Sequence, residues 1–341
     1  MTDLWQKLKT LGRPVILYGM GDGAVRVTDR LSKENIAVAG VMASDGFVRG
    51  QSFLGHTVRR FADIQKEFEN PVVLICFGSE LPKVIDGIRA IPCEKYYPCL
   101  PVIGDGCFDA AFYNLHLKEL STAKAALSDD LSRALFDTAV NFALYGEEKY
   151  LFENLSTEEQ IFDLLNLSNG ERFLDLGAYK GDTAMRFISS VNGYQSVTAV
   201  EPDVRTYKKL CLAFENQKNF TAVNAAVADR VGETDFYCGG GRSSRTASSG
   251  KKVEKIPQIT VDSLCTPFTY IKMDVEGNEK AAIEGARQTI AAHRPKMKIA
   301  CYHRVEDIYD IILTVRAIRP DYKVYLRRTG CIPFWNFDCI F

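Results

Sequence analysis

Residues 173–183 read Phe-Leu-Asp-Leu-Gly-Ala-Tyr-Lys-Gly-Asp-Thr, an apolar run that enters a glycine turn and then a helix-opening segment. A second apolar run, residues 196–201, ends in Glu201, 26 positions after Asp175 (201 − 175). This order is typical of a parallel sheet that binds a nucleoside-bearing cofactor at the carboxyl ends of its strands. The turn glycines let the backbone approach the ligand, and a carboxylate at the second strand's end can accept hydrogen bonds from ribose hydroxyls.

The charges around the turn indicate which cofactor it binds. Dinucleotide sites place helix amides against a pyrophosphate, whereas here Asp175 precedes the turn and Asp182 follows it. Two carboxylates would repel a pyrophosphate, but they would attract the amino group and the sulfonium of S-adenosylmethionine. We therefore expect S-adenosylmethionine as the cofactor. The alternative is an ordinary turn without a ligand, in which Asp182 caps the helix.

Several further runs resemble a known family. They are FLDLGAYKGDT (173–183), VEPD (200–203), VDSL (261–264), YIKMDVEGNE (270–279), and Tyr302-His303 followed by Asp307. Together they resemble the FkbM family of S-adenosylmethionine-dependent methyltransferases, over about residues 150–341. The resemblance implies a class I methyltransferase fold and O-methylation of a hydroxyl on a sugar or another natural product.

Composition limits the other function classes. The chain has 341 residues, 46% of them hydrophobic, and a net charge of −1. It lacks both a basic field for nucleic acid or anionic membrane and an apolar run near the ~20 residues that span a bilayer. Its ten cysteines are dispersed without a C-x-x-C pair, which indicates reduced packing residues. We expect a cytoplasmic protein with a small-molecule or sugar acceptor, no nucleic-acid or membrane partner, and possible homodimerisation.

Strands and helices also alternate in the first 105 residues, which predicts a Rossmann-like parallel sheet. The predicted strands are 15–18, 36–42 and 71–77, and the predicted helices are 24–33, 61–70 and 81–90. Gly19, Gly21 and Ala24 match G-x-G-x-x-A, and Asp45 lies 24 positions after Gly21 (45 − 21). This motif indicates either a nucleotide, NAD or nucleotide-sugar site or glycines that only permit a tight turn.

Between these units, helices are predicted at 121–127, 128–145 and 157–165, from apolar positions at three- and four-residue spacing. We expect this bridge to pack against both sheets; a dimer surface and a cap over the substrate are alternatives. The predicted fold is therefore α/β, with two Rossmann-like parallel-sheet units joined by a helical segment. Its domains are residues 1–105, the bridge 106–168, and the methyltransferase unit 169–341.

In the second unit the sequence predicts a longer alternation. The predicted strands are 172–178, 196–201, 220–227, 234–238, 259–264, 268–275, 296–302, 322–328 and 335–341, and the predicted helices are 182–191, 203–216, 279–292 and 305–318. We expect segment 259–264 to pair with 234–238. The resemblance implies that the final strand is antiparallel.

The expected cofactor-binding residues follow strand ends. They are Asp175, Gly177, Ala178, Gly181, Asp182, Thr183, Glu201, Pro202, Asn224, Ala225 and Asp274. The resemblance implies that the first turn, with Asp182 and Thr183 nearby, lies against the methionine part. Glu201 is expected at the ribose and Asn224 near the adenine. Asp175 and Asn224 could instead cap backbone groups.

Lys272, Asp274 and Glu276 alternate with apolar residues, so they share one face of a strand that is normally apolar on both. We expect Lys272 to pair with Asp175, because a lone buried charge is costly. Asp274 and Glu276 would then lie beside the transferred methyl as base, substrate partner or metal ligand. The run contains no histidine, so we predict no metal requirement. The alternative is a structural ion network.

His303 follows another strand at the same edge. A neutral imidazole accepts protons near pH 7, so His303 is a second candidate base. Asp307 would then be its orienting partner or a helix N-terminal charge. The alternative is a histidine that is simply hydrogen-bonded at a strand end.

The polar segment Gly239–Gly250 carries Arg242 and Arg245. It could cover the substrate as a lid that holds a phosphate or carboxylate, or it could be a surface loop. Two rival functions remain beside methyl transfer: an NAD- or nucleotide-sugar-dependent enzyme that uses the N-terminal glycine turn, and a non-catalytic S-adenosylmethionine-binding protein.

Overall fold

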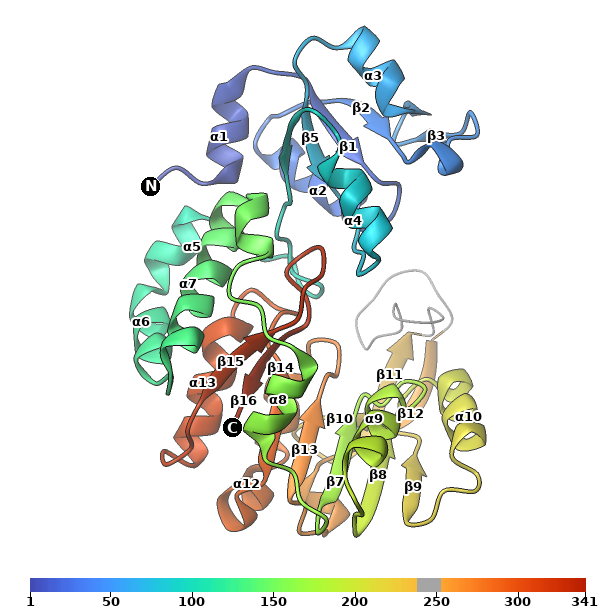
Figure 1. Ribbon diagram of the computed structural model, residues 1–341, viewed down its shortest axis with the longest axis vertical. Helices are drawn as coiled ribbons and strands as arrows, with labels where there is room; N and C mark the ends of the chain where they lie inside the picture. Colours follow the sequence, from blue (N-terminus) through green and yellow to red (C-terminus); the bar gives the residue numbers. More distant parts are fainter. Residues whose placement is uncertain (238–252) are drawn as a thin grey trace.

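The structure is a computed structural model that describes residues 1–237 and 253–341. Figure 1 shows two sheet-containing units arranged along the long axis, with a group of helices beside their junction. We call residues 1–105 the first unit, residues 106–168 the bridge and residues 169–341 the second unit, the ranges expected from the sequence. In the described residues no helix is both long and apolar enough to cross a bilayer.

The first unit contains a six-stranded sheet in the order β3-β4-β2-β1-β5-β6. Five strands are parallel, and β3 is antiparallel to β4. The strands are β1 (Val15–Tyr18), β2 (Val38–Met42), β3 (Ser52–Phe53), β4 (His56–Arg59), β5 (Val72–Ile75) and β6 (Glu94–Tyr96), and the helices are α1 (Leu4–Leu11), α2 (Asp22–Lys33), η1 (Asp45–Phe47), α3 (Phe61–Glu67) and α4 (Pro82–Arg89). The parallel sheet is confirmed. The sequence did not reveal β3, β4 and β6, because they are short and carry polar residues.

The glycine turn of the first unit is explained by packing. A Cβ on Gly23 would lie 2.2 Å from the carbonyl oxygen of Cys76. Gly19 has a φ of +127°, and its Cβ would lie 3.1 Å from the Phe77 ring. Helix α2 therefore begins directly against the end of β5, at a distance that only glycine permits. These contacts favour the tight-turn interpretation of the motif.

The bridge comprises α5 (Ala110–Leu115), α6 (Leu117–Ala125), α7 (Asp130–Tyr145), η2 (Glu148–Leu151) and α8 (Glu158–Leu165). Helix α6 packs against α13 (Asp307–Ile318), and α7 packs against β15 (Tyr325–Arg328). One buried cluster runs from Ile16 in the first sheet through Phe136 in α7 to Ile299 in the second sheet. The bridge and both units thus share a continuous apolar core, as expected for helices that contact both sheets.

The second unit contains a seven-stranded sheet in the order β15-β16-β14-β13-β7-β8-β9. Its strands are β7 (Arg172–Leu176), β8 (Ser196–Val200), β9 (Phe220–Val223), β13 (Tyr270–Met273), β14 (Lys296–Ala300), β15 and β16 (Phe337–Ile340), and its helices are α9 (Asp182–Ser190), α10 (Val204–Ala213), α11 (Glu279–Glu284), α12 (Arg287–His293) and α13. β16 is antiparallel to both neighbours, and the other inter-strand pairs are parallel. The expected antiparallel ending is confirmed.

A small second sheet, in the order β10-β12-β11, corrects one predicted pairing. Strand β11 (Gly232–Tyr237) pairs with β12 (Val253–Ile259), and β12 also pairs with β10 (Ala226–Val227). The predicted strand 259–264 is wrong because the chain turns after Ile259 into the 3-10 helix η4 (Asp262–Leu264). There the Asp262 carboxylate accepts hydrogen bonds from the backbone amides of Gln288 and Thr289, at 2.9 and 2.8 Å.

The predicted helix 279–292 is two helices, α11 and α12, that meet near Gly285. A Cβ on Gly285 would lie 2.1 Å from the carbonyl oxygen of Ala228, and its own carbonyl accepts a hydrogen bond from the Asp262 amide. Close packing against the small sheet thus interrupts the helix.

The cysteines among the described residues are all free, as expected for packing residues.

Candidate active site

Two neighbouring cavities lie at the carboxyl ends of β7, β8 and β13. The first cavity has a volume of about 340 Å³ and the second about 270 Å³. The first is lined by most of the predicted cofactor residues, namely Gly177, Ala178, Asp182, Thr183, Glu201, Pro202, Ala225 and Asp274. It is also lined by all four predicted catalytic residues: Lys272, Asp274, Glu276 and His303. Three predicted cofactor residues do not line it: Asp175, Gly181 and Asn224.

Asp175 is fully buried and serves Lys272 instead of a ligand. Paired strands place the two side by side, and the Lys272 Nζ lies 3.3 Å from Asp175 Oδ1. The same Nζ donates to the Gly177 carbonyl at 3.0 Å and lies 4.0 Å from Asp274 Oδ2. Burial lowers the pKa of Lys272, but the carboxylates of Asp175 and Asp274 outweigh it and raise the pKa, so Lys272 stays charged. The predicted ion pair is confirmed.

The glycines of the turn are required by close backbone packing. Gly177 has a φ of +74°, and its Cβ would lie 1.9 Å from the carbonyl oxygen of Asp274. Gly181 has a φ of +91°, and its Cβ would lie 2.2 Å from the Phe214 ring. The amide of Gly177 also donates to the Val200 carbonyl at 3.0 Å. Gly181 therefore shapes the turn without lining the cavity, which corrects its expected ligand contact.

Glu201 ties together the loops that enclose the first cavity. Its Oε2 accepts a hydrogen bond from the Tyr179 amide at 2.8 Å, and its Oε1 accepts one from the Asp203 amide at 2.9 Å. Burial raises the pKa of Glu201 to about 7, against the lowering effect of these amides. The Asn224 side chain donates to the carbonyls of Glu201 and Pro202 at 2.8 and 3.0 Å. Asn224 is thus the backbone cap that was its alternative interpretation.

Part of the lining of the first cavity is apolar. Beside the predicted Ala225, the cavity is lined by residues that sequence reasoning did not select: Val200, Ala226, Val227 and Phe236. Phe236 comes from β11 in the small sheet, 35 positions after Glu201 (236 − 201). An apolar slot beside a carboxylate suits a purine attached to a ribose.

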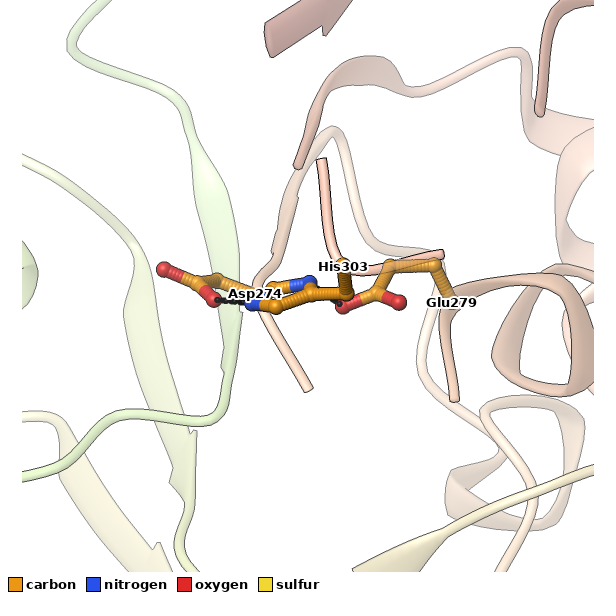
Figure 2. Close-up of side chains that lie close together, drawn as sticks. All are labelled: Asp274, Glu279 and His303. Atoms are coloured by element: carbon orange, nitrogen blue, oxygen red, sulfur yellow. Dashed lines mark ion pairs between the residues drawn. The ribbon is translucent and has the colours of Figure 1, made fainter. Parts of the chain in front are cut away.

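Asp274 and His303, which line the first cavity, form a row of three side chains with Glu279. Figure 2 shows the His303 ring between the carboxylates of Asp274 and Glu279. His303 Nδ1 lies 2.9 Å from Glu279 Oε1, and Nε2 lies 3.5 Å from Asp274 Oδ1 and 3.7 Å from Glu276 Oε2. His303 and Glu279 are each 1% exposed, whereas Asp274 is partly exposed. The buried pair thus orients Asp274 at the cavity wall.

The carboxylates change the expected charge of His303. Burial lowers its pKa, but Glu279 first, and then Asp274 and Glu276, outweigh burial and raise the pKa to about 10. His303 is therefore an imidazolium at neutral pH and cannot accept a proton. This corrects the expected neutral base and leaves Asp274 as the candidate proton acceptor.

Of the two roles expected for Asp307, the structure supports the helix N-terminal charge. Its Oδ2 accepts a hydrogen bond from the Arg304 amide at 2.7 Å, at the start of α13. Glu279 is the orienting partner instead, and its Oε1 also accepts from the Val275 amide at 2.8 Å. Sequence reasoning missed Glu279 because an acidic residue in a first helical turn is ordinary.

Asp274, Glu279 and His303 are close enough to be considered as metal ligands. Their arrangement does not favour an ion, because the two carboxylates face different ring nitrogens. An ion bound through one imidazole nitrogen would meet only one of the two carboxylates at coordination distance. The geometry is that of an imidazolium held between two carboxylates.

The first unit contributes to the same site. Its Glu80 and Val102 line the first cavity together with His303. The Ile103 amide donates to the His303 carbonyl at 2.9 Å, and the Asn336 side chain donates to Glu80 Oε1 at 2.8 Å. No sequence pattern linked these residues, because they are up to 256 positions apart.

The predicted lid, Gly239–Gly250 with Arg242 and Arg245, lies outside the described residues.

A protein-family model matches most of the second unit. Residues 175–319 match the model of the Methyltransferase FkbM domain, so the resemblance seen in the sequence is confirmed for this part of the chain. The first unit lies outside the matched residues. No curated protein matches the chain.

One solved structure is similar over almost the whole chain. It is described as methyltransferase FkbM from Methylobacillus flagellatus KT, with 20% identity and a TM-score of 0.72, and the match covers 96% of this chain and 90% of that one. Fibrillarin from Aeropyrum pernix, solved with natively bound S-adenosyl-L-methionine, matches less well: 14% identity, a TM-score of 0.32, and 51% and 66% coverage. The first likeness establishes the fold, which matches that of a methyltransferase FkbM over both units.

Proposed function

We propose that the protein transfers the methyl group of S-adenosylmethionine to a hydroxyl group on a sugar or another natural product. The Methyltransferase FkbM match over residues 175–319 supports methyl transfer. One observation carries the finer proposal: a single cavity is lined by the Glu201 carboxylate, by a set of apolar side chains and by the Asp274 carboxylate. The first two features suit an adenosyl group, and the third suits the removal of a hydroxyl proton.

The residues of the first cavity fit S-adenosylmethionine in chemistry. Glu201, held by two backbone amides, can accept hydrogen bonds from both ribose hydroxyls when ionised. The apolar residues around Ala225 and Phe236 can enclose the adenine. Asp182 and Thr183, at the start of α9, can meet the amino group of the methionine part.

When bound, the cofactor supplies an activated methyl group and a neutral thioether as the leaving group. The chain then has to position the acceptor oxygen in line and receive its proton as the new oxygen–carbon bond forms. Asp274 lines both cavities, so it can contact the acceptor hydroxyl beside the cofactor. His303 and Lys272 hold that carboxylate in place, since both are cations within 4.0 Å of it. We propose no metal in this mechanism.

The rival functions have less support. The glycines of Gly19–Ala24 are explained by packing against β5, so an NAD or nucleotide-sugar site there has no independent support. A non-catalytic binding protein would not need the buried pair of His303 and Glu279 behind Asp274. The net charge of −1 supports a small-molecule acceptor over a nucleic acid.

The test is calorimetric titration of the protein with S-adenosylhomocysteine and, separately, with NAD. We expect micromolar binding of S-adenosylhomocysteine, at least tenfold weaker in Glu201→Ala, because the ribose partner is lost. The matched control is Glu215→Ala, an exposed carboxylate outside both cavities. Binding of NAD with no binding of S-adenosylhomocysteine would overturn the proposal.

Turnover separates an enzyme from a binding protein. The protein would be incubated with methyl-labelled S-adenosylmethionine and a panel of sugars and hydroxylated natural products. Transfer of label to an acceptor, lost in Asp274→Asn with cofactor binding retained, is the expected result. Transfer at the wild-type rate in that variant would show that Asp274 is not the proton acceptor.

A further inference from the structure

The second cavity extends from the first toward helix α8. Seven residues line both cavities and mark where they meet: Glu80, Asp182, Thr183, Lys272, Asp274, Tyr302 and Asn336. Asp274, the candidate proton acceptor, thus lies at the junction. A molecule in the second cavity would reach the same carboxylate that lines the first cavity.

The second cavity has two chemically different walls. One is the apolar face of α8, with Ile161, Phe162 and Leu165. The other is the sheet, where Lys298 Nζ lies 3.2 Å from Asp338 Oδ2 beside Lys272. A parallel sheet is normally apolar beneath a helix, and buried ion pairs rarely stabilise a fold more than apolar packing does. Charged side chains on this face are therefore better explained by a polar ligand.

Such walls suit a compact polyhydroxylated ring. The Lys298 ammonium can donate hydrogen bonds to hydroxyl oxygens, and the Asp338 carboxylate can accept them from hydroxyl hydrogens. Thr329 and Asn336 add further polar groups near the junction. The apolar wall of α8 can meet the carbon–hydrogen face of a ring.

The charge of the lining excludes one class of acceptor. Among the described residues, five carboxylates line the second cavity: Glu80, Glu158, Asp182, Asp274 and Asp338. Three cations line it: Arg186, Lys272 and Lys298. The excess of two negative charges (5 − 3) would repel a phosphate or carboxylate on the ligand, and the repulsion is stronger in a partly enclosed site than in water.

We propose that the second cavity is the acceptor site and that it takes a hydroxylated compound without negative charge, such as a neutral sugar or an amino sugar, and excludes sugar phosphates, uronic acids and nucleotide sugars. This inference rests on the proposed function, because it takes the first cavity as the cofactor site. It assigns Lys298, Asp338 and α8 to acceptor binding, and none of these was selected from the sequence.

The test uses the whole protein saturated with S-adenosylhomocysteine, whose own binding is measured first. Methyl α-D-glucopyranoside, D-glucosamine and D-glucuronate are then titrated, with binding followed by saturation-transfer NMR. We expect the neutral and cationic probes to bind at least about tenfold more tightly than D-glucuronate. The double variant Glu80→Gln/Glu158→Gln, which equalises the charges at three and three, should reduce that preference by about threefold or more.

The matched control is Glu153→Gln/Glu159→Gln, which removes two exposed carboxylates outside both cavities and should leave the preference unchanged. Equal or tighter binding of D-glucuronate to the unaltered protein would overturn the inference, and so would binding of none of the probes. An unchanged preference in the cavity variant would also overturn it. If S-adenosylhomocysteine itself fails to bind, the proposed function fails instead, so the two failures are distinguishable.

Discussion

The charge of His303 gives the sharpest test of the site. Glu279→Gln removes the carboxylate nearest to the ring while keeping an oxygen that can accept from the Val275 amide. At an effective dielectric constant of about 20, unit charges 2.9 Å apart interact by about 6 kcal/mol, equivalent to about 4 pKa units. We therefore expect the pKa of His303 to fall from about 10 to near the ordinary histidine range.

The assay is NMR titration of the histidine Cε1–H signals, which is simple because the chain has only four histidines. His303→Asn assigns the signal. The control is Glu284→Gln on the same helix, which removes a partly exposed carboxylate paired with Arg287. A wild-type His303 that titrates near pH 6.5, or an unchanged pKa in Glu279→Gln, would refute the conclusion that Glu279 keeps His303 charged at neutral pH.

The same shift has a consequence for stability. The folded-state pKa of His303 is raised above its ordinary 6.5. The contribution of the charged ring to the free energy of unfolding is therefore complete below about pH 6.5 and is lost as pH rises toward 10. Chemical denaturation should show this loss in the wild type and a much smaller one in Glu279→Gln. Parallel profiles of stability against pH for the two proteins would contradict a stabilising role of the charged His303.

Four further predictions concern the first cavity and the residues around it. The affinity for S-adenosylhomocysteine should rise as pH increases through about 7, where Glu201 ionises, and calorimetry should find no such rise in Glu201→Gln. Because the pKa of Glu201 is raised in the folded state, the folded protein keeps this proton up to a higher pH than the unfolded chain does. The stability of the ligand-free protein should therefore fall between pH 4.5 and 7. Gly177→Ala should lower the melting temperature far more than Gly55→Ala, because both have positive φ but only the first Cβ would meet backbone, 1.9 Å from the Asp274 oxygen. Methyl transfer should persist in excess chelator. Its loss, restored by Mg²⁺ or Zn²⁺, would show that Asp274, Glu279 and His303 bind an ion.

Sequence alone determined the features that depend on local spacing. Apolar runs and glycine turns located the main strands, and the rules for parallel connections placed the ends of β7, β8 and β13 at one edge. Neighbouring strands in register then made the pairing of Lys272 with Asp175 predictable. Glu201 could be selected because a carboxylate after the second strand lies beside the first turn.

Only the tertiary structure decided which side chains converge from distant segments. Glu279 meets His303 across 24 positions (303 − 279), and Glu80 meets Asn336 across 256. The second cavity exists because α8 covers the charged face of the sheet. Sequence periodicity shows which face of an element is apolar, but not which element packs against it or which carboxylates gather there. The charge of His303 depends on that gathering, because electrostatic interactions follow distance in space and not distance along the chain.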